Sequence, residues 1–358
     1  MAEVLVIGGG MAGISIAYEL AAHARVVLVE AEPTLAVHTT GRSAAIFAPS
    51  YGGPVVRVLT AASAPRYRAL ETELDTPPLL SPRTVVWLGA DDEGAAHLDA
   101  LPAEPITPAE ARTLCPPLRD VTAAARDDSA SDIDVMALHD GYRRGLRARG
   151  GTIRTGHRVT AIARDGAGWR VTAGEELTAD VVVDAAGAWA DELAVLAGVP
   201  PTGLRPLRRT AAIASGAASI DPGWPLVADA ADRYYFRPEG ERLLISPSDE
   251  TPSEPCDAKP DELDVALAME RVNEHTTFGL RRVHTAWAGL RSFVGDRNPV
   301  VGAWPDHPGF AFFAGQGGYG IQMAPALAAL GAAVVLGVPV PTDVGIAARD
   351  VLPGRSAN

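Results

Sequence analysis

The N-terminal segment contains the pattern that most constrains the fold. A β-branched run at residues 4–8 leads into glycines at 8, 10 and 13, spaced GxGxxG. A stretch with helical apolar spacing follows at 13–24, and a second strand-like run at 25–30. Strand, glycine turn, helix and strand in this order form a βαβ unit. The sequence therefore predicts an α/β fold whose sheet begins at the N-terminus.

The glycines and one acidic residue of this unit indicate dinucleotide binding. Gly8 suits the tight turn, Gly10 lets the backbone approach a pyrophosphate, and Gly13 lets helix and strand pack closely. The helix N-terminus offers free N–H groups and a partial positive charge to the phosphates. Glu30 ends the second strand, where it is placed to bind ribose hydroxyls; the alternative is a solvated strand end. The motif alone leaves open which dinucleotide is bound.

Composition excludes several kinds of partner. The 358-residue chain has a net charge of −13, which disfavours nucleic acid and anionic membrane surfaces. Its two cysteines have no metal-ligand spacing, so neither a metal site nor a disulfide is expected. The N-terminal apolar run lacks a basic flank, and the apolar stretch at 324–340 is interrupted by Pro and Gly. We expect a cytoplasmic protein without stable membrane insertion.

The order of segments predicts two interleaved domains. Residues 133–150 have the pattern of an amphipathic helix, and 179–193 that of a buried strand, a small-residue turn and a helix. Strand-like runs occur within 204–284, and residues 310–330 return to strand, glycine turn and helix. We predict a discontinuous nucleotide domain at 1–48, 131–203 and 285–358. A mainly antiparallel β substrate domain at 49–130 and 204–284 is expected to be inserted in it.

Four further motifs complete a family pattern. They are TGRSAA at 40–45, AAGAWADEL at 185–193, WAGLRSF at 287–293 and GQGGYGIQ at 315–322. With the N-terminal glycines they resemble the FAD-dependent D-amino acid oxidase (DAO) superfamily, and the bacterial D-arginine/D-amino acid dehydrogenases look most similar. The resemblance covers nearly the whole chain. It implies noncovalent FAD in a Rossmann-like, glutathione-reductase-type domain.

The resemblance also implies a set of cofactor contacts. Arg42 would supply countercharge to the pyrophosphate. The helix after the glycine run would direct its N-terminus at the flavin and stabilise negative charge on reduction; the alternative is a turn without a ligand. The implied cofactor-binding residues are Gly8, Gly10, Gly13, Glu30, Arg42, Ser43, Val159, Gly187, Gly317, Gly318, Tyr319, Gly320 and Ile321.

Two arginines are candidates for binding a substrate carboxylate. In LRRTAAIA, alternation puts Arg209 on the face of Leu207 and Ala211, so its charge needs an anion. Arg291 is likewise a single charge in an apolar segment. The resemblance assigns both to the substrate carboxylate, together with Tyr51 and Tyr235. The alternatives are that each arginine pairs with an internal carboxylate and that each tyrosine is a core residue.

Two departures from the family pattern bear on specificity. Ile46 stands where the family has an active-site histidine, and Val85 where the D-arginine enzymes have a glutamate. With Gly318 they are predicted to line the substrate pocket. None of the eight histidines falls on a catalytic family position, so we expect surface or structural roles. An apolar wall predicts a substrate with a neutral, hydrophobic or small side chain.

The resulting hypothesis is an FAD-dependent dehydrogenase or oxidase acting on CH–NH2 or CH–NH donors. Hydride transfer from Cα of a D-amino acid to flavin N5 would give an imino acid, which hydrolyses to a 2-oxo acid and ammonia. The electron acceptor is left open between oxygen and a quinone-like molecule. One alternative is a glycine-, sarcosine- or other secondary-amine oxidase, or a biosynthetic relative acting on an unusual amine. The other is a nonenzymatic flavin-binding or scaffold protein.

Overall fold

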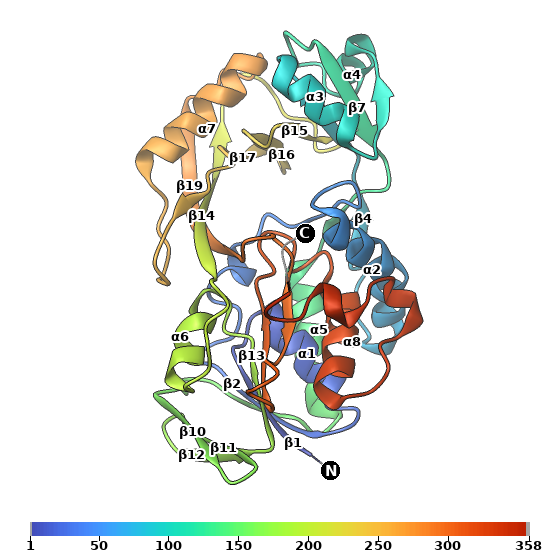
Figure 1. The fold of residues 1–358 in the computed structure, drawn as a ribbon. Helices are drawn as coiled ribbons and strands as arrows, with labels where there is room; N and C mark the ends of the chain where they lie inside the picture. Colours follow the sequence, from blue (N-terminus) through green and yellow to red (C-terminus); the bar gives the residue numbers. More distant parts are fainter. Residues whose placement is uncertain (1, 356–358) are drawn as a thin grey trace.

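The computed structural model describes residues 2–355 and contains two large β-sheets. Figure 1 shows one sheet in the lower half of the molecule and the other in the upper half. The long strands β14 (Arg205–Ser215) and β19 (Arg282–Phe293) belong to the upper sheet and extend toward the lower one. Within residues 2–355, no helix is both long enough and apolar enough to cross a membrane.

The lower sheet has six strands in the order β20-β21-β13-β1-β2-β9, and β20 alone pairs antiparallel. Side chains of β1 alternate between two apolar layers, as expected for a parallel sheet covered on both faces: Val4 and Val6 face one, Leu5 and Ile7 the other. The strands are β1 (Glu3–Ile7), β2 (Arg25–Val29), β9 (Thr152–Arg154), β13 (Val181–Asp184), β20 (Val300–Gly302) and β21 (Phe310–Ala314).

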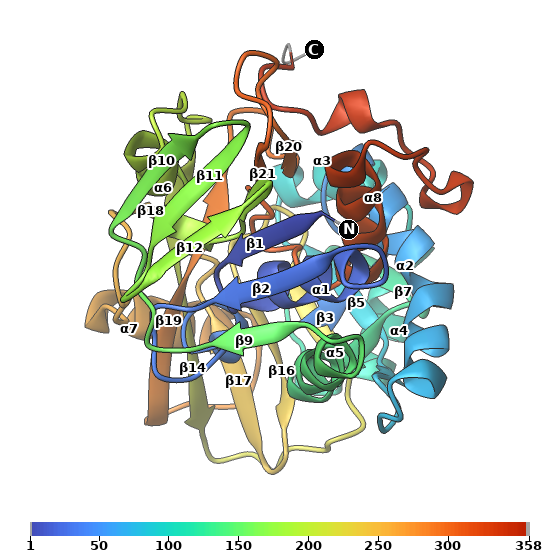
Figure 2. The same ribbon diagram turned by 90° about the horizontal axis from the view of Figure 1, so that it is seen from below.

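Helices cover one face of this sheet, and a small sheet covers the other (Figure 2). The helical side consists of α1 (Met11–Leu20), α5 (Val135–Ala148) and α8 (Ala324–Leu336). The opposite side carries β10 (Ala161–Asp165), β11 (Gly168–Thr172), β12 (Glu176–Ala179) and α6 (Ala190–Leu196). Helix α8 has no charged residue and is buried over most of its length, because α1 and α2 (Pro54–Glu73) both pack on it.

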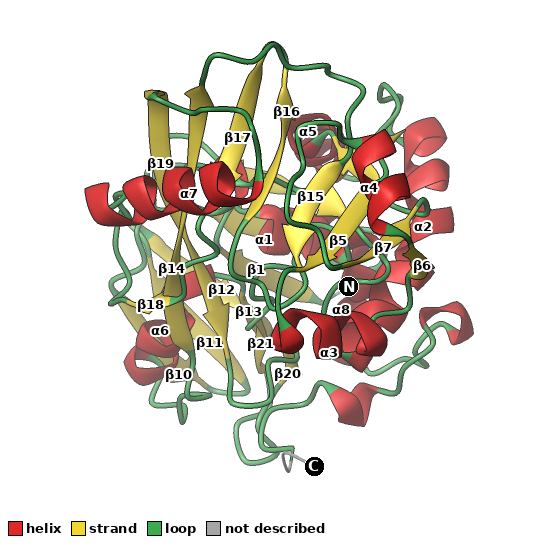
Figure 3. Cartoon of the chain, turned by 90° about the horizontal axis from the view of Figure 1, so that it is seen from above, coloured by secondary structure: helices red, strands yellow, loops and turns green. Residues whose placement is uncertain are grey.

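The upper sheet has nine strands and is mainly antiparallel, with one parallel pair between β5 and β15. Helix α7 (Glu262–His275) lies across its strands (Figure 3). Helices α3 (Asp92–Ala100) and α4 (Pro108–Leu114) pack at its other end. Besides β14 and β19, the strands are β5 (Val85–Gly89), β6 (Glu104–Ile106), β7 (Ala123–Asp127), β15 (Leu226–Asp229), β16 (Tyr235–Glu239), β17 (Arg242–Ser246) and β18 (Thr251–Pro252).

A fourth sheet, with three strands, connects the two halves. It consists of β3 (Ile46–Phe47), β8 (Ser131–Ile133) and β4 (Leu80–Pro82). The α/β class and the antiparallel second sheet agree with the sequence prediction. The exact domain limits stay a prediction: α2 falls in the segment assigned to the substrate domain, yet it packs on α8 of the lower sheet.

Candidate active site

A solvent-open cavity of about 300 Å³ extends from the glycine turn of β1 to strands β14 and β19. Its walls come from both large sheets, from the turn after β13 and from the glycine run before α8. One end of the cavity lies beside Glu30, and Arg209, Tyr235 and Arg291 are on the β14, β16 and β19 side. The cavity thus joins the predicted cofactor residues to three of the predicted substrate residues.

The N-terminal glycines are required by close backbone contacts. Gly8 has φ +110°, and a Cβ there would lie 2.5 Å from the carbonyl oxygen of Ala185. At Gly13 an added Cβ would lie 1.8 Å from the carbonyl oxygen of Gly8, so helix and strand could not approach as they do. Gly8 and Gly10 line the cavity, whereas Gly13 packs behind the turn. The tight turn at Gly8 and the close helix–strand packing at Gly13 are as expected, and the approach of Gly10 to a pyrophosphate stays a prediction.

Side chains from two other segments hold this turn in place. Glu30 accepts hydrogen bonds from the backbone N–H of Gly9, at 2.6 Å, and of Glu32, at 2.8 Å. The ring of buried His139 in α5 lies with Nε2 3.0 Å from the carbonyl oxygen of Gly9. A carboxylate has about four acceptor positions, so Glu30 retains capacity for a ligand hydroxyl.

Arg42 lines the cavity, but its guanidinium is directed at protein groups. It donates to the carbonyl oxygens of Ala258, at 2.8 Å, and Ala288, at 3.1 Å, and forms an ion pair with Asp257. These contacts fix residues 40–42, a 3₁₀ turn, against β19. The pyrophosphate role of Arg42 stays a prediction, and in the structure its charge is paired with Asp257.

Most of the other predicted cofactor residues also line the cavity. They are Ser43, Val159, Gly187, Gly317, Gly318, Gly320 and Ile321. Tyr319 differs, because its ring is 9% exposed and packs on Tyr51 and Phe293. Helix α8 begins at Ala324, three residues after the last of these lining residues. The first turn of α8 therefore does not itself line the cavity.

The glycine run has a packing role that the sequence did not reveal. A Cβ on Gly317 would lie 2.0 Å from the ring of Phe293, and one on Gly318 would lie 2.8 Å from the guanidinium of Arg291. Both partners are on β19. The missing side chain at 318 therefore makes room for the predicted substrate arginine.

Strand pairing brings Arg209 and Arg291 to the same face of the sheet. In the antiparallel register of β14 and β19, Arg209 lies opposite Gly289, and Leu207 lies opposite Arg291. The two arginines are thus diagonal neighbours whose side chains leave the sheet on one side. Arg209 is only 6% exposed, and its Nη1 has no hydrogen-bond partner within residues 2–355. The arrangement leaves a buried cationic donor beside the cavity.

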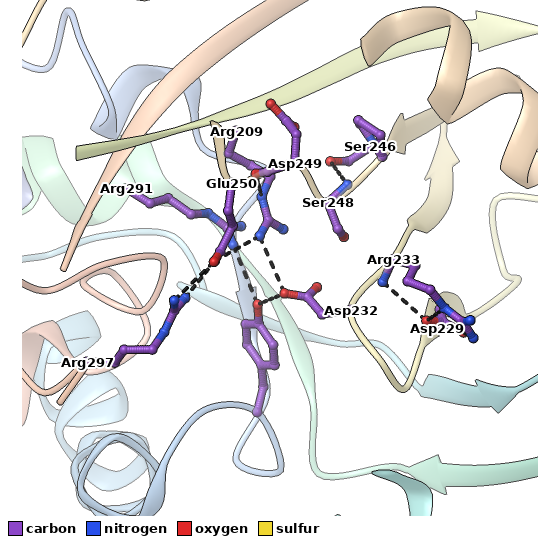
Figure 4. A network of polar contacts seen from close by, with 12 residues as sticks. Arg209, Asp229, Asp232, Arg233, Ser246, Ser248, Asp249, Glu250, Arg291 and Arg297 are labelled. Carbon is purple, nitrogen blue, oxygen red and sulfur yellow. Dashed lines mark hydrogen bonds and ion pairs between the residues drawn. The ribbon is translucent and has the colours of Figure 1, made fainter. Parts of the chain in front are cut away.

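Two acidic residues lie close to Arg209. This agrees with the alternative that the arginine pairs with internal carboxylates. Arg209 Nη2 lies 3.4 Å from an oxygen of Asp232 and 3.4 Å from an oxygen of Glu250, and its Nε donates to the carbonyl oxygen of Asp249 at 2.8 Å. Glu250 also forms a bidentate pair with Arg297, at 2.6 and 3.0 Å. Burial would raise the pKa of Glu250, but the ion pair with Arg297 outweighs it and lowers that pKa. Figure 4 shows these groups converging.

The two tyrosines lie next to the arginines. The hydroxyl of Tyr51 is 3.5 Å from Arg291 Nη1 and 3.5 Å from a carboxylate oxygen of Asp232. Burial, and then the charge of Asp232, raise the pKa of Tyr51 well above its usual value, so it keeps its proton. Tyr235 lines the cavity from β16. Both positions suit donors to a carboxylate, and these roles stay predictions.

Ile46 and Val85 lie together in one apolar cluster that also contacts Tyr51 and Tyr235. Val85 is 1% exposed. Neither side chain reaches the cavity wall described above, so they form the apolar layer beneath the tyrosines. Their predicted effect on specificity stays a prediction.

Several residues at the site were not predicted from the sequence. Asp232 and Glu250 carry no motif, since each is an ordinary polar residue in a turn or loop, and Gln316 lies within the GQGGYGIQ motif but was not itself assigned a role. His38 was expected to be surface-exposed or structural, and it lines the cavity, packs with a tilted ring against Trp189 and contacts Glu32 at 3.0 Å. Only the position of Asp232 three residues before Tyr235 could have drawn attention to it.

Comparison with known proteins identifies the family. The family model described as DAO, FAD dependent oxidoreductase, matches residues 3–334. The chain belongs to the DAO family of FAD-dependent oxidoreductases. The cofactor and enzyme class expected from the sequence are thereby confirmed. The closer likeness to D-arginine dehydrogenases stays a prediction.

Individual DAO-family relatives match over most of the chain. A Bos taurus protein named FAD-dependent oxidoreductase domain-containing protein 1 is 27% identical over 395 aligned residues, covering 93% of this chain and 81% of the relative. Glycine oxidase from Geobacillus kaustophilus superimposes with a TM-score of 0.84 at 20% identity, covering 99% of this chain and 100% of the other. L-proline dehydrogenase from P. horikoshii superimposes with a TM-score of 0.83 at 20% identity, and 96% of each chain is covered. The structural matches show a shared fold.

The cavity of this DAO-family chain fits FAD. Gly8, Gly10 and Gly318 line the cavity without side chains, so the backbone is bare where a flat, extended cofactor must approach. Gln316 lines the cavity, and its buried Nε2 has no partner among the described residues. A buried donor without a partner is costly unless a ligand supplies the acceptor.

Proposed function

We propose that this enzyme oxidises the Cα–N bond of a small amino acid, and specifically of a D-amino acid with a neutral side chain. The observation that carries the proposal is Arg209, whose buried Nη1 lacks a partner within the described chain and lies beside Arg291 at the cavity. A guanidinium pair binds a planar carboxylate well. Tyr51 and Tyr235 belong to an apolar cluster with Ile46 and Val85 that contains no carboxylate for a cationic side chain, which favours a neutral one.

In this proposal the protein binds and orients the substrate. Arg209 and Arg291 hold the carboxylate, the Tyr51 hydroxyl donates to it, and Tyr235 covers the substrate from β16. Bound FAD supplies the hydride acceptor. The substrate amine must be neutral for the C–N bond to gain double-bond character, and the imino acid then hydrolyses to a 2-oxo acid and ammonia. A protonated Tyr51 serves as a hydrogen-bond donor and not as a base.

A second candidate is a secondary-amine or glycine oxidase. It is favoured by the relatives themselves, since a Bacillus licheniformis glycine oxidase is 40% identical over 62 residues, covering 17% of each chain. An iminodiacetate oxidase from Chelativorans sp. BNC1 superimposes with a TM-score of 0.77. Both candidate functions require the arginines to bind a substrate carboxylate. They differ in the substituent on the substrate amine. A nonenzymatic flavin protein is disfavoured because the arginines and tyrosines are retained.

The central experiment is anaerobic reduction of the purified protein. It should be yellow, and its visible absorbance should bleach on addition of an accepted D-amino acid, glycine or sarcosine. A panel of D- and L-amino acids and secondary amines, each with oxygen and with a dye acceptor, separates the candidates. We expect neutral D-amino acids to be oxidised faster than D-Arg or D-Lys. If no FAD can be bound, the proposal fails.

The carboxylate role is tested by Arg209→Ala. Removing this buried contact should cost about 2–5 kcal/mol in substrate binding or transition-state stabilisation. The measurement is kcat/KM with the best substrate of the panel. Arg170→Ala is a matched control, because Arg170 lies on β11 and pairs with Asp165 at the surface. Equal kcat/KM in wild type and Arg209→Ala would remove the assignment.

A further inference from the structure

We propose that Asp232 is a built-in competing anion, whose carboxylate occupies the place of the substrate carboxylate in the empty enzyme and must be displaced before substrate binds. The inference rests on the proposed function, because it assumes that Arg209 and Tyr51 bind the substrate carboxylate. It adds a residue that lowers the affinity of the site for anions.

The contacts of Asp232 are those expected of a substrate carboxylate. One oxygen, Oδ2, lies 3.4 Å from Arg209 Nη2 and 3.5 Å from the hydroxyl of Tyr51. Tyr51 in turn reaches Arg291 at 3.5 Å. Figure 4 shows Asp232 directed at the same space toward which Arg209 and Arg291 point. A single protein carboxylate therefore contacts two of the four predicted carboxylate donors, Arg209 and Tyr51.

These contacts are loose compared with the neighbouring ion pair. Charge-assisted hydrogen bonds between N–H and carboxylate groups are normally about 2.7–2.9 Å long. The Arg297–Glu250 pair has bonds of 2.6 and 3.0 Å, in a bidentate geometry, whereas both contacts of Asp232 exceed 3.3 Å. Glu250 is thus committed to Arg297. Asp232 is the anion that a substrate can replace.

The backbone around Asp232 lets the side chain move without moving the turn. Asp232 lies between β15 and β16 with φ +54°, and its N–H donates to the carbonyl oxygen of Asp229. The next residue, Arg233, is fixed by Asp229 and Asp91. The Asp232 side chain is 45% exposed, although its partner Arg209 is 6% exposed. Rotation of this one side chain toward solvent is enough to remove the Asp232 contact from Arg209.

A competing anion has a clear physical benefit in the empty enzyme. A buried guanidinium without an anion is strongly unfavourable. The long contacts of Asp232 balance the charge of Arg209 in the empty enzyme, and a ligand carboxylate can still displace them. The cost appears as weaker binding of every carboxylate, since each ligand must first break the Asp232 contacts.

The test measures binding of propionate to the FAD-loaded enzyme, followed by the change in flavin absorbance. Asp232→Asn removes the charge, and asparagine tolerates the positive φ as aspartate does. We expect propionate to bind about tenfold more tightly, as for removal of a competing ion pair at a partly buried site. Asp232→Ser is a second variant without the charge, and it keeps the test valid if Asp232→Asn does not fold.

Two controls separate displacement from general electrostatics. Glu250→Gln removes an equally distant negative charge, 3.4 Å from Arg209, that is held by Arg297. Asp120→Asn changes an exposed aspartate of similar φ, +55°, far along the chain. Tightening specific to the Asp232 variants supports the proposal. Equal tightening in Glu250→Gln, no tightening in the Asp232 variants, or no propionate binding by any form overturns it.

The same titration distinguishes the inference from the proposed function. If Arg209→Ala binds propionate as well as the wild type does, the carboxylate role of Arg209 is wrong and the inference falls with it. If Arg209→Ala loses propionate binding while Asp232→Asn is unchanged, the proposed function stands and the inference alone is overturned.

Discussion

At the scale of single residues, Tyr51 tests how the site handles protons. Its raised pKa keeps the hydroxyl protonated over the working pH range. In the proposed function the rise of activity with pH therefore comes from the substrate ammonium group. Tyr51→Phe should raise KM about tenfold or more, since a hydrogen bond to a charged group contributes about 1.5–3 kcal/mol.

The pH profile of the same variant provides the sharper measurement. Between pH 7 and 10, kcat/KM should rise in Tyr51→Phe as steeply as in the wild type. A profile that flattens in the variant would make Tyr51 a base and contradict the donor role.

Asp184 predicts a pH-dependent stability that is independent of catalysis. It is fully buried at the end of β13, and its Oδ2 has no partner within residues 2–355. Burial raises the pKa of Asp184 well above its ordinary value, so the folded state holds a proton that the unfolded state releases. The stability that this proton provides is complete below about pH 3.9, the unfolded pKa, and is lost as pH rises toward the folded pKa.

Asp184→Asn should therefore raise the free energy of unfolding at pH 7–8 by about 1.4 kcal/mol for each unit of pKa shift. Below about pH 4 the variant and the wild type should be equally stable, because both carry a neutral side chain. Denaturant unfolding at several pH values measures this. The exposed Asp99, changed to Asn, is the control. A stability difference that does not depend on pH would contradict the assigned protonation.

At the scale of secondary-structure elements, α8 depends on a glycine in its centre. A Cβ on Gly331 would lie 2.5 Å from the ring of Phe313 and 3.0 Å from Ile16, which are both fully buried. Gly331→Ala should lower the free energy of unfolding by about 1–3 kcal/mol, because this core cannot accept another methyl group. Gly295→Ala is the control, since no atom of the described chain lies within 4 Å of the added carbon. Equal free energies of unfolding in urea for Gly331→Ala and the wild type would contradict this prediction and show that α8 can shift.

Elements that depend on neighbouring residues could be predicted from the sequence. The predicted strand, helix and strand at 4–8, 13–24 and 25–30 are observed at Glu3–Ile7, Met11–Leu20 and Arg25–Val29. The burial of Arg209 also follows from local alternation. Its diagonal placement beside Arg291 does not, because it requires the long-range register of β14 and β19.

Contacts between distant segments escaped prediction for the same reason. Arg42 has the expected place in the chain, but its pairing with Asp257 depends on a loop more than 200 residues away. Val85 was assigned to the pocket from alignment alone, whereas pairing of β5 with β15 and β7 places it in an apolar layer. Asp232 lies in a turn whose sequence has no distinguishing pattern.

At the scale of the whole molecule, the cavity connects both large sheets, so the bound cofactor should stabilise the entire chain. With FAD at about 100 times its Kd, the folded state gains about 2.7 kcal/mol. For a chain of this size, removing FAD should lower Tm by about 4 °C. Thermal unfolding of the stripped and reloaded protein checks this. An unchanged Tm would mean that the cofactor contacts one part of the fold alone.

The missing side chain of Gly318 has a consequence for the comparison of related sequences. Because the guanidinium of Arg291 fills the space that a Cβ would need, the two positions should vary together among relatives. Homologues that keep the arginine should keep the glycine, and homologues with a larger residue at 318 should have lost the arginine and, with it, this mode of carboxylate recognition. The presence of both Gly318 and Arg291 in a homologue would then identify it as a member of the family that acts on amino acids.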